Sequence, residues 1–237
     1  FGQKDIDDVL TPEELSRLLA VSSVQILRDR AIRNWVDFTI DERNGVAVAK
    51  LCQLLDGNPL ALELAAHLVV NFDLATLYNE LTRNYTLLAA DLQDLPFRQR
   101  SIYNTIDYSW RLLPPDLATL LAQFSTFHGI FSQQATAAIT DALPRHLTQL
   151  VHRSLLHVDE QRHFHIHEMV RQFAEQKLAQ DEVLQLATQQ RHSDYYIRLL
   201  SEWQHETQRK PIVAQLLPHL DNIYAALEWA FEHGSFE

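Results

Sequence analysis

Residues 162–174 change their hydrophobic spacing part-way along, and this change limits the folds open to the chain. Residues 162–167 alternate polar and apolar as a half-buried strand does, whereas Met169 and Phe173 recur at helical spacing. We therefore predict a strand that runs directly into a helix, with His167 at the junction. The first N–H groups of a helix lack partners inside it, and together with the helix dipole they favour a bound anion. His167 is therefore the first candidate functional residue.

The rest of the chain favours helix. Leu, Ala, Gln and Glu dominate, only 5 of the 237 residues are Gly, and runs of β-branched residues are few. A hydrophobic content of 46% is enough to bury a core. The sequence predicts a mainly α protein.

The charge and the cysteine count limit the partners and the compartment. The formal net charge of −11 argues against a domain that binds nucleic acid through its overall field, so we do not expect direct DNA binding. No apolar run approaches the roughly 20 residues that a membrane span needs. The single Cys52 cannot form an internal disulfide, which fits a reducing compartment. We expect a cytoplasmic protein with no membrane partner.

Residues 1–94 are predicted to form a helical subdomain. A helix begins after Thr11, because Pro12 and Glu14 complete a capping-box pattern. Further along, Gly57-Asn58-Pro59 ends one helix and lets Pro59 open the next, which is apolar nearly all round and should be central. Residues 91–96 are predicted to be a linker.

Residues 95–180 are predicted to form a winged-helix subdomain. Four short helices are expected, the third capped by Ser132 and the fourth opened by Pro144. A small β-hairpin then turns through residues 159–162, and the helix after His167 follows it. Helices followed by such a wing are typical of the winged-helix arrangement.

Residues 181–237 are predicted to return to helix and to begin an α-helical sensor or repeat region of the TPR-like kind. Asn222 is expected to cap the last helix, and Trp229 is expected to lie in the core. About one repeat is present, whereas a solenoid usually needs about three for stability.

Three short motifs in order resemble one family. They are Gly57-Asn58-Pro59 with the apolar helix after it, Arg98-Gln99-Arg100-Ser101, and Ile166-His167-Glu168 with the helix that follows. In this order and spacing the chain, from about residue 11 to 237, resembles STAND-class signal-transduction ATPases, and within them the NB-ARC-type bacterial transcriptional regulators. The resemblance implies a regulatory portion that closes over ADP held by a P-loop domain, with a signal sensed by the helical repeats.

The resemblance implies roles for matching residues only. Gly57 and Pro59 look like the Gly-x-Pro motif, whose Pro packs near the adenine of the nucleotide. Ile166-His167-Glu168 looks like the Met-His-Asp motif, whose His contacts the ADP β-phosphate and holds the inactive, closed state. Glu168 departs from the motif by one methylene, which leaves its acidic role plausible and its geometry open.

The larger departure is an absence from the sequence. It contains no Gly-x-x-x-x-Gly-Lys-Ser/Thr phosphate loop and no apolar strand ending in paired acids for magnesium. We therefore expect no enzymatic activity from this chain and no tightly bound ADP or ATP; the nucleotide belongs to a full-length parent that acts as a slow NTPase switch. Because the first residue is Phe1, we expect a piece of a longer protein.

Alternatives remain open at this point. His163, His165 and His167 would share one strand face and could bind a metal, but no further ligand completes the set, and a solvated wing is the simpler interpretation. Residues 144–154 could be the recognition helix of a DNA-binding winged helix. Residues 181–237 could be a protein-interaction scaffold. For His167 the simpler alternative is a helix-start residue bonded to backbone.

Overall fold

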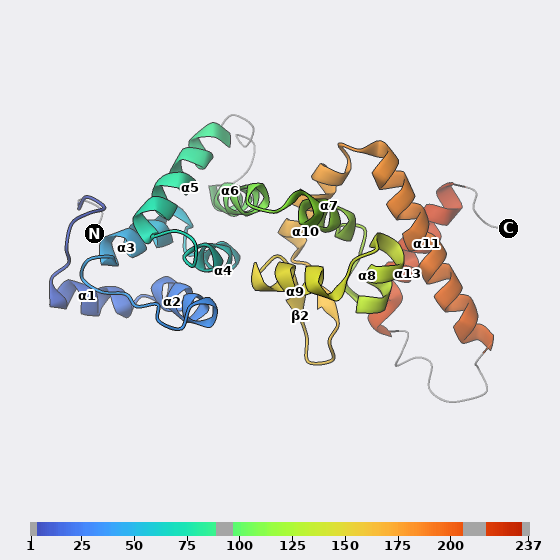
Figure 1. Ribbon diagram of the computed structural model, residues 1–237, viewed down its shortest axis with the longest axis horizontal. Helices are drawn as coiled ribbons and strands as arrows, with labels where there is room; N and C mark the ends of the chain where they lie inside the picture. The colour runs from blue at the N-terminus through green and yellow to red at the C-terminus, as the bar shows by residue number, and fades with distance from the viewer. Residues whose placement is uncertain (1–3, 89–96, 206–216, 234–237) are drawn as a thin grey trace. The chain divides into compact units, whose positions relative to one another are not determined.

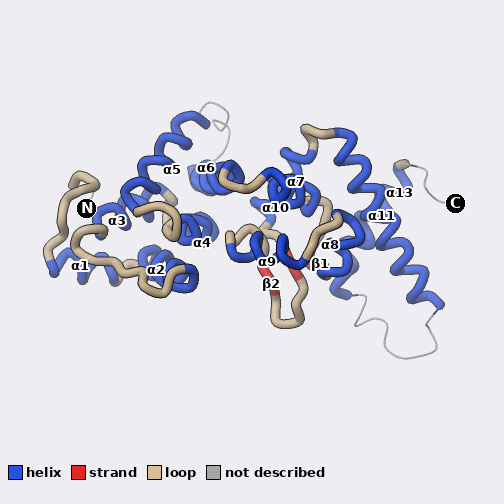
Figure 2. The backbone as a smooth tube through the Cα atoms, viewed as in Figure 1, coloured by secondary structure: helices blue, strands red, loops and turns tan. Residues whose placement is uncertain are grey.

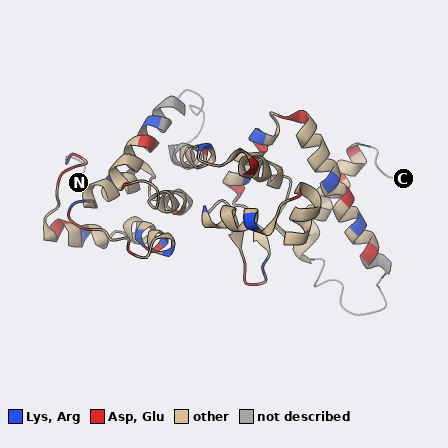
Figure 3. Ribbon diagram, in the orientation of Figure 1, with Lys and Arg blue, Asp and Glu red and all other residues tan. Residues whose placement is uncertain are grey.

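The computed structural model describes residues 4–88, 97–205 and 217–233. The chain divides into two compact units, unit 1 (Phe1–Leu112) and unit 2 (Leu113–Glu237). Helices dominate both units, and unit 2 also contains a small sheet (Figure 2). This confirms the mainly α prediction. Figure 3 shows acidic and basic residues interspersed along the helices of each unit. Among the described residues, none of the helices has the length and apolarity needed to cross a membrane.

Unit 1 is a layered set of helices (Figure 1). They are α1 (Pro12–Leu19), α2 (Ser22–Asn34), α3 (Gly45–Leu54), α4 (Pro59–Leu68), α5 (Leu74–Leu88) and α6 (Phe97–Arg111). The predicted capping box opens α1: the Glu14 N–H donates to Thr11 Oγ1 over 3.3 Å, and the Thr11 N–H donates to Glu14 Oε2 over 2.8 Å. Helix α4 packs against both α2 and α6, so its nearly continuous apolar surface is buried as predicted.

Unit 2 begins with a winged-helix topology. Its elements are α7 (Pro115–Phe124), β1 (Ile130–Phe131), α8 (Gln133–Thr140), α9 (Pro144–His152), β2 (His157–Val158), β3 (Phe164–His165) and α10 (Glu168–Leu178). The strands form one antiparallel sheet in the order β1-β3-β2, with Phe164 opposite both Phe131 and Val158. Ser132 caps α8 and Pro144 opens α9, and the hairpin lies where the sequence predicted it.

Strand β1 was not predicted. It has only 2 residues, and its place in the sheet comes from pairing with β3, whose residues lie far along the chain. Phe131 of β1 is fully buried together with Phe124 and Phe127, and the rings of Phe127 and Phe131 stack at 4.3 Å. The aromatic cluster fixes β1 against the helices of the winged helix.

The rest of unit 2 is α11 (Glu182–His205), the short 3-10 helix η1 (Leu217–His219) and α13 (Leu220–Glu232). Figure 1 shows α11 and α13 side by side, and α11 also packs on α7, α8 and α10. The prediction that Asn222 caps the last helix is wrong. The helix already begins at Leu220, and Asn222 lies in its first turn with a fully buried side chain.

The predicted division at residues 1–94, 95–180 and 181–237 stays a prediction. The expected linker at residues 91–96 lies outside the described residues. In the structure α6 belongs to unit 1, and the helices after residue 181 pack within the same compact unit as the winged helix.

Candidate functional site

The first predicted contact point is the start of α4 in unit 1. Gly57 has a φ of +62°, a conformation that costs residues with a Cβ free energy, and it completes the turn that ends α3. Asn58 then caps α4, because its Oδ1 accepts hydrogen bonds from the N–H groups of Leu60 (3.0 Å) and Ala61 (3.2 Å). Pro59 follows at the first helical position, with an exposed ring. Two of the N–H groups at the start of α4 are therefore already bonded by the cap residue.

A cavity of about 390 Å³ adjoins Gly57 in unit 1. Ser23 and Cys52 also line it, whereas Pro59 does not. Burial raises the pKa of the Cys52 thiol to about 11, so the thiol stays protonated and is no nucleophile. The predicted Gly57 thus lies beside a largely apolar hollow, and Pro59 lies on the surface next to it.

The second predicted contact point is the start of α10 in unit 2. His167 is the N-cap residue: its backbone is extended, its side chain is exposed, and its Nδ1 accepts a hydrogen bond from the Met169 N–H over 3.2 Å. The simpler alternative, a helix-start histidine bonded to backbone, is therefore present in the structure. A histidine cap satisfies one N–H here, whereas Asn58 satisfies two at α4.

Glu168, next to His167, is held by an arginine. Arg171 donates from Nε and Nη2 to the two carboxylate oxygens of Glu168, both over 2.8 Å. This fork-to-fork pair holds the pKa of Glu168 at about 2, well below its usual range. The Arg171 Nη1 also donates to Glu175 Oε2 over 3.2 Å and to the Ser125 carbonyl over 3.3 Å. The acid of the motif is thus engaged within unit 2, and Arg171 connects the start of α10 to the segment after α7.

The histidines of the wing do not converge. The His163 Nδ1 lies 3.2 Å from Asp159 Oδ2, and the His165 ring stacks on His157 across the sheet at 5.0 Å. His167 is turned to its own helix. No group of three or more potential ligands for a metal occurs among the described residues.

A buried polar junction connects the winged helix to α11 and α13, and it was not predicted from the sequence. The Asn222 Oδ1 accepts from the His128 N–H over 2.8 Å, and its Nδ2 donates to the carbonyls of His128 (2.6 Å) and Ile130 (2.9 Å). His192 Nε2 lies 3.2 Å from the same Oδ1. Burial lowers the pKa of His192 to about 4, so its ring is neutral at neutral pH.

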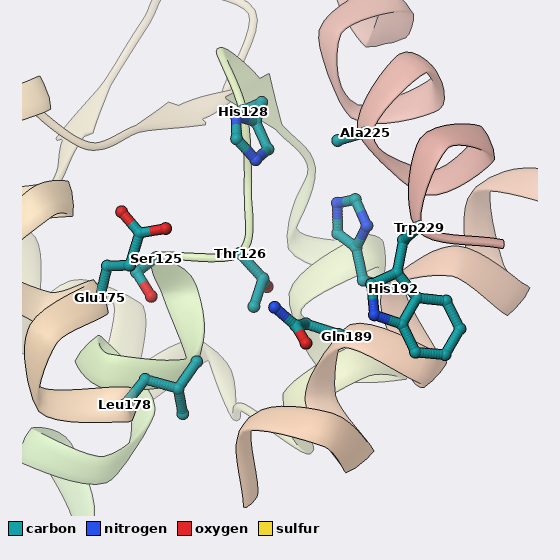
Figure 4. A pocket seen from close by; sticks show the side chains of 9 residues that line it. All are labelled: Ser125, Thr126, His128, Glu175, Leu178, Gln189, His192, Ala225 and Trp229. Carbon is teal, nitrogen blue, oxygen red and sulfur yellow. The ribbon is translucent and has the colours of Figure 1, made fainter. Parts of the chain in front are cut away.

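Beside this junction lies a cavity of about 90 Å³ (Figure 4). Its walls come from α10, α11, α13 and the segment after α7, and include Glu175, Gln189, His192 and Trp229. Trp229 was predicted to be a core residue; it lies on the α13 stripe but its indole faces this cavity. Every residue of this wall belongs to unit 2.

Comparison with known proteins points to regulators of transcription. An alignment of 224 residues, covering 90% of the chain, is 31% identical to a Mycobacterium bovis protein named "Putative HTH-type transcriptional regulator". Proteins of the same name from two strains of Mycobacterium tuberculosis match equally well. The chain is similar to bacterial transcriptional regulators. It spans 25% of the length of these relatives.

A shorter match involves a Mycobacterium bovis protein named "Uncharacterized protein", which is 28% identical over 121 residues, 51% of this chain and 31% of that protein. No protein-family model matches the chain, and no solved structure matches it significantly. The similarity supports a regulatory role in bacteria. The relatives' name also runs against the expectation, drawn from net charge, that direct DNA binding is unlikely.

Sequence reasoning found both helix starts but missed the residues between the winged helix and the last helices. His128, Asn222 and Trp229 lie on loops or helices without a motif, and their partners are up to 94 residues away. One signal was present. Asn222 lies in a helix whose apolar residues predict burial, and a buried side-chain amide needs a hydrogen-bond partner.

Proposed function

We propose that this chain is the regulatory part of a bacterial transcriptional regulator of the STAND, NB-ARC-like kind, which closes over ADP held by a P-loop domain elsewhere in a longer protein. The observation that carries the proposal is the exposed imidazole of His167 at the N-terminus of α10, directly after the wing. Support also comes from the relatives, which are about four times as long as the matched stretch, since that stretch is 25% of their length.

The cap of α10 prepares His167 for such a contact. Because Nδ1 accepts the Met169 N–H, the neutral ring carries its proton on Nε2, which is then a donor. A donor beside the positive end of a helix dipole favours a phosphate oxygen. Gly57 and Pro59 of unit 1 would meet the base side of the same nucleotide.

The switch would have two states. His167 and Pro59 would contact ADP only in the closed state, and a ligand shifts such an equilibrium only through its different affinity for the two states. The chain itself supplies no phosphate loop, so hydrolysis would belong to the parent's P-loop domain.

The test is ADP release from the full-length protein carrying His167→Asn. Asn keeps a capping oxygen for α10, as Asn58 does for α4, but removes the ring. Since a hydrogen bond to a charged group contributes about 1.5 to 3 kcal/mol, ADP should leave about tenfold faster or more. His152→Asn, at an exposed histidine in the last turn of α9, is the control and should leave release unchanged. Equal rates of ADP release from the unmutated full-length protein and from His167→Asn would exclude the role.

A second candidate is direct DNA binding by the winged helix, which the name of the relatives favours because helix-turn-helix motifs bind DNA. On α9, Arg145 and His152 are exposed, whereas His146 is buried with its Nδ1 accepting from the Leu143 N–H over 3.2 Å. Few basic groups therefore face outward there. A gel shift of the chain at rising salt tests this candidate: affinity that falls steeply with salt supports it, and no shift at low salt excludes it.

A further inference from the structure

The 90 Å³ cavity of unit 2 contains a hydrogen-bond donor that lacks an acceptor. Among the described residues, the Trp229 Nε1 is buried and has no hydrogen-bond partner. Buried N–H groups in native proteins are nearly always paired with protein, water or ligand. Figure 4 shows this ring nitrogen and the Gln189 amide on one side of the cavity and the Glu175 carboxylate on the other. The cavity thus has an unpaired N–H donor, that of Trp229, on one side and a carboxylate acceptor, that of Glu175, on the other.

The surroundings of the cavity are acidic. A larger hollow of about 640 Å³ shares His128 and Trp229 with it and is lined by Asp221, Glu228 and Glu232. No Lys or Arg lines either hollow within the described part of the chain. A simple anion that met the Trp229 N–H would therefore enter a negative field without a counter-charge.

The nearby basic groups do not supply that counter-charge. Burial lowers the pKa of His192 to about 4 and also lowers the pKa of His128, so both rings are neutral at neutral pH. Arg171 does not line the cavity, and its guanidinium is paired with the carboxylates of Glu168 and Glu175. An anionic acceptor for the Trp229 N–H is therefore favoured only when the same molecule also carries a positive charge.

We propose that this cavity binds a small zwitterion of the α-amino acid class. The carboxylate would accept from Trp229 Nε1 and the Gln189 amide, and the ammonium would face Glu175. The cavity volume suits the common head of an amino acid, and the larger hollow, which shares Trp229 with the cavity, has room for a side chain.

The site would also reach the start of α10. Ser125 and Glu175 line the cavity, and Arg171 donates hydrogen bonds to both of them and to Glu168, next to His167. An ammonium that draws Glu175 away would rearrange the partners of Arg171. This regulatory step rests on the proposed role of His167, whereas binding of the zwitterion does not.

Calorimetry on the chain tests the binding. The probes are the L-α-amino acids one at a time, with acetate as a carboxylate-only probe and spermidine as an amine-only probe. One or a few amino acids should bind, and acetate should not. Trp229→Phe, which keeps an aromatic ring but removes the indole N–H, should weaken that binding at least about tenfold. Trp35→Phe in unit 1 is the matched control and should leave it unchanged.

Three outcomes would overturn the proposal. If no amino acid binds, the cavity holds water only. If Trp229→Phe binds as tightly as the parent, the indole N–H has no part in recognition. If spermidine binds as well as any amino acid, the acidic hollow alone attracts amines. None of these readouts involves nucleotide, so a normal ADP release by His167→Asn would leave this proposal standing.

Discussion

Two asparagines lie at helix starts in the two units, and their partners differ completely. Asn58 in unit 1 accepts from the N–H groups of residues two and three positions ahead, so both of these hydrogen bonds stay within its own helix. Asn222 in unit 2 bonds His128, 94 residues away, and His192, 30 residues away. One residue type thus closes a helix locally in unit 1 and joins distant segments in unit 2. Four experiments can break or sharpen this comparison.

The largest effect is expected from Asn222→Leu. The substitution keeps the branched shape of the side chain but leaves the His128 N–H and the carbonyls of His128 and Ile130 without their buried partner. Since each unsatisfied buried group costs about 1 to 3 kcal/mol, unit 2 should lose about 3 kcal/mol or more. Urea unfolding, monitored through hydrogen exchange in α11 and α13, measures this loss of stability. A loss under about 1 kcal/mol would mean that the junction is not a stabilising contact.

Acid should weaken unit 2 before unit 1. The pKa of His192 lies at about 4 in the folded state against 6.5 for the free group, so the unfolded chain binds the proton more readily. Its contribution is complete above pH 6.5 and is lost as the pH falls toward 4, by roughly 3 kcal/mol in all. Burial lowers the pKa of His128 and His219 as well, so His192→Gln should reduce this slope rather than abolish it.

The measurement is urea unfolding at pH 7 and pH 4.5 for the parent and His192→Gln. Glu168, whose pKa is about 2, loses its contribution only as the pH falls below 4.5, so its titration falls outside this window. An equal pH slope in parent and variant would show that the buried ring does not carry the effect.

A smaller loss is expected from Asn58→Ala. It removes the two cap hydrogen bonds of α4 and should cost unit 1 about 1 kcal/mol, while Asn58→Ser, another good cap, should restore most of it. Thermal unfolding of the variants provides the comparison. If Asn58→Ala cost as much as Asn222→Leu, the distinction between local and long-range asparagines would fail.

The smallest change is expected from His167→Asn on stability. The new side chain can cap α10 as the ring does, and the position is exposed, so the free energy of unfolding should change by less than about 0.5 kcal/mol. Denaturant unfolding checks this. A large loss would make the histidine a structural residue, and its effect on ADP release could then not be assigned to nucleotide contact.

Local chemistry explains what the sequence could predict. The starts of α1, α8 and α9 and the strand-to-helix junction at His167 all depend on residues within a few positions of each other, and each was found. The apolar surface of α4 likewise identified it as central. The same local reasoning placed Gly57, Pro59 and His167 at helix starts, and the alternative of a His167 bonded to backbone agrees with its Nδ1 accepting from the Met169 N–H.

Long-range pairing explains what was missed. Strand β1 exists because Ile130 and Phe131 pair with His165 and Phe164, and two residues alone carry no strand period. Asn222 resembles a cap residue because Asn is common there, whereas its partners His128, Ile130 and His192 lie far away along the chain. The cavity beside Trp229 is likewise assembled from four separate segments. Apart from the amide of Asn222, such contacts have no signature in one sequence read alone.

The central claim is that the start of α10 contacts ADP only in the closed state. The direct measurement is amide hydrogen exchange at Met169 and Val170 in the full-length protein, once with ADP and once with a non-hydrolysable ATP analogue. We predict slower exchange at these two amides with ADP, and loss of that difference in His167→Asn. Equal exchange rates in the two nucleotide states of the parent would contradict the account.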